Sequence, residues 1–142
     1  MPMRRDKIDQ GSTSYATLDM FKGPVSHTDT VRVDVSALTS DEVDDDGYLK
    51  PGVPFDENGD LVADDGAGNV GSVHGVTVEP NRVGDGSGNP TGNYDVAVAT
   101  IGQLIQPVAE ENLGRDYTDA ELTGFEGGAG SDAGAPSQIV LV

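Results

Sequence analysis

Residues 46–55, DGYLKPGVPF, restrict the fold of this chain more than any other stretch. The segment begins with a turn and continues as a short apolar strand that two prolines interrupt. The loop at residues 56–60 contains an Asn-Gly pair, which is typical of hairpin turns. Residues 61–62 would then form the returning strand of the hairpin. Because proline and glycine fix the backbone, the pattern predicts a rigid β-element that presents a contact edge. The residues expected along this edge are Tyr48, Leu49, Pro51, Val53 and Phe55.

Composition also favours strands, because valine outnumbers leucine by 17 to 8 and β-branched side chains suit a pleated sheet. Leu, Ile, Val and Phe together make up only 32 of 142 residues, while glycine contributes 20. A chain with so little apolar side chain can build one thin core. The expected class is therefore mainly β with small α additions (α+β), as a compact domain of short strands and long Gly/Asp loops.

Alternation of apolar and polar residues predicts several strands. Residues 30–35 place three valines on one face, and Gly75 in the strand at residues 73–78 indicates a bulge or a close approach of backbones. Residues 94–101 are apolar on both faces and form the best candidate for a central strand. An apolar run at residues 138–142 predicts a further strand, buried in the sheet or in an interface.

Two short helices are expected in the C-terminal half of the chain. Residues 108–113 can form one or two helical turns. Thr118 and Glu121 have the spacing of a capping box, in which the hydroxyl and the carboxylate each accept a hydrogen bond from an opening amide. Glycines at positions 124, 127 and 128 keep the second helix short.

The first 29 residues show no sustained period and are expected to form an extended arm, with residues 30–142 as a single β-rich domain. Three of the eight basic residues lie within the first seven positions, so the arm has a basic tip suited to an acidic partner. A frayed terminus explains the same pattern equally well. The residues expected to dock the arm are Arg4, Arg5, Lys7, Tyr15 and Phe21.

The formal net charge of −17 argues against nucleic acid as a direct ligand, because phosphates would be repelled. Acidic blocks such as residues 44–46 are expected to form a solvated face. A high-salt (halophilic) host is a sharper explanation, since dense carboxylates keep a protein soluble where screening is strong. The chain has no cysteine, and no apolar run is long enough for a signal peptide or a membrane span.

Catalytic and metal-binding patterns are incomplete. An EF-hand loop starting at Glu42 places Asp44, Asp46 and Gly47 correctly, but its twelfth position is Val53 instead of a bidentate glutamate. Residues 127–132, GGAGSD, match the start of a calcium β-roll repeat only once. The two histidines lie in unrelated contexts, and no nucleophile or phosphate-binding motif is present. We therefore expect no enzyme, no cofactor, no metal and no small-molecule substrate.

Several segments resemble a known family in their order along the chain: DGYLKPGVPF, then VHGVTVEP, then YDVAVATIGQLI, and finally SQIVLV. This order is similar to that of the head decoration, or cement, proteins of tailed viruses such as bacteriophage lambda. The resemblance covers roughly residues 46–142, and the acidic insertions at residues 41–46 and 79–92 depart from it.

Membership of that family would imply a structural virion protein on the outer surface of the capsid. It would form a homotrimer whose N-terminal arms reach the major capsid protein, and it would stabilise the expanded shell. The alternative is another virion or extracellular structural module, such as a tail or turret component or an adhesin domain. An acidic calcium-binding domain is a further alternative.

Overall fold

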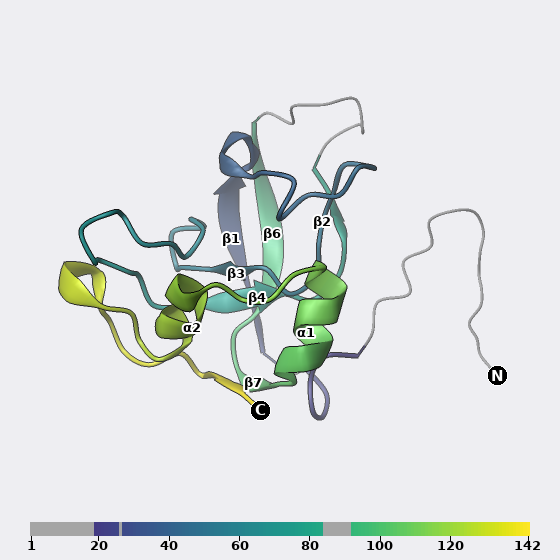
Figure 1. Ribbon diagram of the computed structural model, residues 1–142. Coiled ribbons are helices and arrows are strands. Elements are labelled where there is room, and N and C mark those ends of the chain that lie inside the picture. The colour runs from purple at the N-terminus through teal and green to yellow at the C-terminus, as the bar shows by residue number, and fades with distance from the viewer. Residues whose placement is uncertain (1–18, 26, 84–91) are drawn as a thin grey trace.

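The computed structural model describes residues 19–25, 27–83 and 92–142. Within these ranges the chain folds into short strands, two short helices and long loops, so the predicted mainly β class with small α additions is confirmed (Figure 1).

The strands are β1 (Thr28–Asp34), β2 (Tyr48–Leu49), β3 (Pro54–Phe55), β4 (Gly75–Thr77), β5 (Asn81–Arg82), β6 (Asn93–Ala99), β7 (Gly102–Leu104) and β8 (Ile139–Leu141). The helices are α1 (Gln106–Leu113) and α2 (Asp119–Phe125), and the 3-10 turns are η2 (Val35–Ala37) and η3 (Gly130–Asp132).

The main sheet has the order β1-β6-β4-β3, and all of its neighbouring strands are antiparallel. The alternation predicted for β1 is confirmed, because Val31, Val33 and Val35 are all buried. Strand β6 is an interior strand, as expected. It is not buried on both faces along its whole length, however: Tyr94 and Ala97 are exposed, whereas Val96, Val98 and Ala99 at its C-terminal end are buried.

Gly75 marks a close approach of backbones, as its position in a strand predicted. A Cβ atom at this residue would lie 2.6 Å from the carbonyl oxygen of Ala99 and 2.7 Å from a methyl group of Val98. Because neither β4 nor β6 can move without breaking its ladder, only glycine fits at this position.

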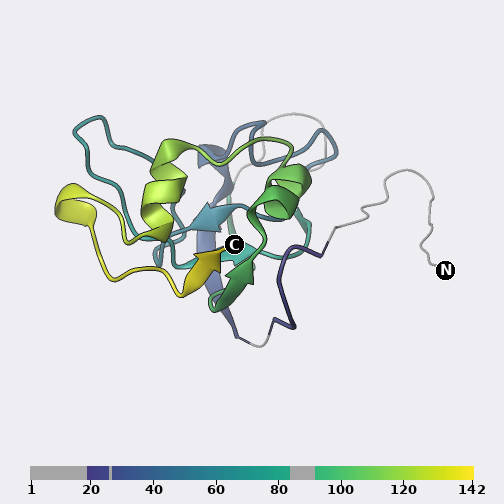
Figure 2. The ribbon, with the colours of Figure 1, turned by 60° about the horizontal axis from the view of Figure 1, so that its bottom comes forward.

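Two further sheets complete the fold: β2 pairs with β5, and β7 pairs with β8 in parallel. Helix α1 carries a proline in its first turn and ends at Gly114, whose φ of 81° is left-handed. The capping box at Thr118 and Glu121 opens α2 as predicted. Both views place α1 and α2 on one side of the main sheet (Figures 1 and 2).

The expected boundary between arm and domain at residue 29 is wrong. Strand β1 already begins at Thr28, and Met20 and Phe21 are buried in the hydrophobic core. Phe21 forms an antiparallel bridge with Leu104 of β7, and the Ile105 amide donates to the Met20 carbonyl. The described part of the expected arm is therefore integral to the domain.

Candidate interaction surfaces

Most of the element at residues 46–55 lies in the interior of the protein and does not form a contact edge. Leu49, Val53 and Phe55 have no exposed surface, Pro51 is buried, and Tyr48 is partly buried. Side chains covered in this way cannot touch a partner, so the contact-edge prediction is corrected.

Hydrogen bonds explain why this element is held inside. The buried Thr77 hydroxyl donates to the Lys50 carbonyl at 2.8 Å and accepts from the Val53 amide at 2.9 Å. On the other side, the Tyr117 hydroxyl donates to the Gly52 carbonyl at 2.7 Å. Prolines and a left-handed glycine leave the segment poorly able to satisfy its own backbone, and β4 and Tyr117 supply the missing partners.

The docking residues predicted for the arm fall into two groups. Arg4, Arg5, Lys7 and Tyr15 lie outside the described residues. Phe21 is only 5% exposed and packs in the core, so its predicted role as a docking residue is corrected. The sequence pattern around it, an isolated aromatic in an irregular stretch, did not distinguish a core residue from an interface anchor.

Several of the aspartates stabilise turns by accepting hydrogen bonds from backbone amides. Asp44, Asp56 and Asp65 each accept hydrogen bonds through one carboxylate oxygen from the amides two and four residues ahead. The residue three positions after each aspartate is a glycine with positive φ: Gly47, Gly59 and Gly68. The Asp-x-x-Gly spacing that signals this turn is present in the sequence, and it accounts for blocks that otherwise suggest calcium loops.

Arg115 links the connector before β2 to the start of α2 through contacts with buried carboxylates. Arg115 binds both carboxylate oxygens of buried Glu121, at 2.7 and 2.9 Å, and lies 3.8 Å from buried Glu42. The bidentate bond to Glu121 raises the pKa of Arg115 above its ordinary value. Arg115 neutralises Glu121 and lies near the Glu42 carboxylate, so these three side chains have a structural role.

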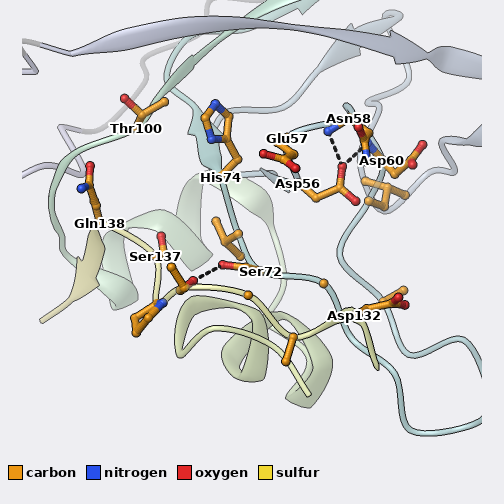
Figure 3. A pocket seen from close by; sticks show the side chains of 18 residues that line it. Asp56, Glu57, Asn58, Asp60, Ser72, His74, Thr100, Asp132, Ser137 and Gln138 are labelled. Carbon is orange, nitrogen blue, oxygen red and sulfur yellow. Dashed lines mark hydrogen bonds between the residues drawn. The ribbon is translucent and has the colours of Figure 1, made fainter. Parts of the chain in front are cut away.

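An open groove of about 840 Å³ lies between the loop at residues 56–60 and the loop at residues 132–138 (Figure 3). Ser72, which also lines the groove, donates from its hydroxyl to the Ala135 carbonyl at 2.7 Å and so joins its own segment to the loop at residues 132–138. His74 lies against Asp29 at 2.8 Å, a hydrogen bond that lowers the pKa of that carboxyl. Among the described residues, no three His, Cys, Asp or Glu side chains gather closely enough to hold a metal ion.

The β7–β8 sheet carries an apolar surface. Ile101, Val140 and Val142 are 39%, 55% and 51% exposed, and these are three of the four large exposed apolar side chains in the described chain. Val140 pairs with Gln103, and alternation along each strand places all four side chains on one face. We call these four residues the β7–β8 strip.

The two segments that form the strip contain no charged side chain, and the neighbouring segment carries one basic residue, Lys22, whose amide donates to the Gln103 carbonyl. Residues 99–109 and 133–142 contain no Asp, Glu, Lys or Arg, although these types make up 23% of the chain. Strand β8 pairs with β7 along one edge, and no other described strand pairs with its second edge. Sequence reasoning found the apolar run at residues 138–142, but it did not show that residues 99–109 lie beside it.

Comparisons with protein-family models, with curated proteins and with solved structures found no match to this chain. None of the helices in the described ranges has the length and apolar character that crossing a membrane requires.

Proposed function

We propose that this chain is a structural virion protein of a tailed virus that binds the outer surface of the capsid as a homotrimer and stabilises the expanded shell. The observation that carries the proposal is the β7–β8 strip. An apolar, uncharged surface on a chain of net charge −17 is suited to contact with protein, since exposed apolar groups gain by leaving water.

The interior of the domain supports a mechanical role. Among the described residues, the buried polar or charged side chains are Glu42, Thr77 and Glu121: the Thr77 hydroxyl accepts from the Val53 amide, and Glu42 and Glu121 both lie against Arg115. The Pro/Gly element is pinned from two sides by Thr77 and Tyr117. A domain built in this way keeps a fixed shape, which is what a clamp on a protein lattice requires.

The proposed mechanism is stabilisation by selective binding. A protein that binds only the expanded lattice shifts the equilibrium towards that lattice by mass action. Three arms on one trimer act together, so weak contacts with the major capsid protein sum to a strong attachment. Arg4, Arg5 and Lys7 give the N-terminal segment a basic tip, in contrast to the acidic body.

Co-sedimentation tests the proposal directly. The full chain is mixed with expanded and with unexpanded shells assembled from the major capsid protein encoded in the same genome. We expect the chain to pellet with expanded shells only, and to raise the temperature at which those shells break. Absence from the expanded-shell pellet would contradict the proposal, and binding to purified tails instead would favour a tail component.

A truncation tests the part played by the arm. A variant lacking residues 1–18 keeps Met20 and Phe21, which the core needs, so it is the appropriate deletion. We expect it to melt at the temperature of the full chain and to lose shell binding. Equal binding by the truncated and the full chain would contradict docking through the arm.

A further inference from the structure

We infer that the β7–β8 strip is the surface through which copies of this chain contact one another, with a second copy as its occupant. This inference rests on the proposed function, because it assigns a contact surface to the homotrimer. Under this inference, the N-terminal segment remains available to bind the shell.

Charge identifies the occupant. Residues 19–142 contain 23 Asp and Glu against 5 Lys and Arg, so two copies of this body repel one another. Like charges placed opposite one another across an interface disfavour association. Copies can therefore approach closely only where neither presents carboxylates, and the uncharged segments at residues 99–109 and 133–142 meet at the strip.

Of the five described basic residues, four are engaged within their own copy, and the fifth, exposed Lys22, lies beside the strip, where its amide donates to the Gln103 carbonyl. Arg32 pairs with Asp95, Arg115 with Glu121, and Arg82 stacks over the Tyr48 ring. The Lys50 ammonium donates to the carbonyls of Ser40 and Asp41. A contact between copies that relied on salt bridges from these four residues would have to break these existing interactions.

The shape of the region fits a small interface. Val140, the most exposed apolar side chain of the strip, lies opposite Gln103 in the β7–β8 register and can serve as its centre. A standard interface buries about 800 Å² on each partner, which is more than three side chains provide. The uncharged polar residues around the strip supply the rim that most interfaces have: Gln103, Gln106, Ser137 and Gln138.

Association through this surface should depend strongly on salt. The screening length falls from ~10 Å at 0.1 M salt to ~3 Å at 1 M. Repulsion between the acidic bodies is then confined to groups in contact, and the strip has no charged side chain. We therefore expect monomers at 0.1 M KCl and trimers at 2 M KCl.

The experiment is sedimentation velocity of the full chain at both salt concentrations, with charge-reversed variants. Val140→Asp and Val140→Lys both place a charge in the strip, and both should weaken association at 2 M KCl at least ten-fold. Ala97→Asp and Ala97→Lys are matched controls on the exposed face of β6, and both should associate as the unmodified chain does. Circular dichroism confirms that each variant is folded.

The lysine variants distinguish the loss of an apolar contact from an effect of the change in net charge. If Val140→Lys associates as well as the unmodified chain while Val140→Asp does not, the effect is general repulsion and the inference is overturned. A monomer at 2 M KCl, or equal effects at positions 97 and 140, overturns it as well. As a second measurement, amide exchange in β7 and β8 at 2 M KCl should slow as protein concentration rises, and unchanged exchange would contradict the interface.

Parallel shell-binding assays distinguish this inference from the proposed function. Self-association through Val140 without any binding to expanded shells would contradict the proposed function and leave the contact surface standing. Shell binding by a chain that never self-associates would contradict the contact surface alone.

Discussion

The Tyr117 hydroxyl provides a sensitive probe of how the Pro/Gly element is held in the core. It donates a 2.7 Å hydrogen bond to the Gly52 carbonyl, and its ring packs edge-on against Phe125 with centroids 5.4 Å apart. Tyr117→Phe keeps the ring and its packing and removes only the donor. The Gly52 carbonyl is then left in a buried site without that hydrogen bond.

The magnitude follows from burial. Leaving a buried acceptor without a partner costs about 1–3 kcal/mol, compared with a net contribution of about 1 kcal/mol for a typical intramolecular hydrogen bond. Gly52 cannot turn its carbonyl towards water, because it is buried and its φ of 92° is fixed by the adjacent turn. For a domain of this size the cost corresponds to a melting temperature lower by roughly 3–10 °C.

Ionisation of the same hydroxyl should make the free energy of unfolding depend on pH. Burial raises the pKa of Tyr117 above its ordinary value. Above pH ~10 the unfolded chain releases this proton while the folded chain retains it, so the free energy of unfolding falls as pH rises. The unmodified protein should therefore lose stability more steeply between pH 9 and 11 than Tyr117→Phe does.

Urea unfolding at pH 7, 9, 10 and 11 measures both effects. Tyr94→Phe is the matched control, because Tyr94 is 38% exposed and its removal should change stability by less than about 0.5 kcal/mol. The reasoning would be refuted if Tyr117→Phe matched Tyr94→Phe at pH 7 and showed the same alkaline slope as the unmodified protein.

Three further predictions concern packing, charge and turns. Gly75→Ala forces a Cβ atom to within 2.6 Å of the Ala99 carbonyl and should cost at least about 1–3 kcal/mol in urea unfolding, whereas Gly134→Ala meets only ordinary contact at 3.6 Å and should be neutral. Raising KCl from 0.1 to 2 M should increase the free energy of unfolding, since salt screens repulsion within a chain of charge −17; equal or lower stability would contradict this. Hydrogen bonds from the Asn69 side chain and from backbone amides lower the pKa of Asp65. The contribution of Asp65 to stability is therefore present above pH ~3.9 and is lost as pH falls through its folded pKa. An NMR titration midpoint of Asp65 at or above ~3.9 would contradict the turn geometry.

Features with a local cause were predictable from the sequence. The valine alternation of β1 requires only that one face of a strand be buried, and the capping box of α2 requires only two side chains at the right spacing. Gly75 was recognisable because a glycine inside a strand leaves room for another backbone. In each case the information lies within a few residues of the feature itself.

The candidate site was not predictable in this way. Residues 46–55 and residues 138–142 are both short apolar segments, and each was a reasonable candidate for a contact surface. The Asp-x-x-Gly turns also went unrecognised, because a run of carboxylates suggests metal ligands as readily as it suggests caps for backbone amides.

The sequence by itself determined that this chain forms short strands, capped turns and a thin valine-rich core, because propensity, periodicity and turn chemistry act over a few residues. Only the tertiary structure decided which apolar segment is covered. Thr77 and Tyr117, 25 and 65 residues beyond Gly52, bury the Pro/Gly element, while the parallel pairing of β7 and β8 leaves Val140 in solvent. Whether a segment is buried depends on residues distant in sequence that pack against it. No local sequence pattern specifies which residues those are.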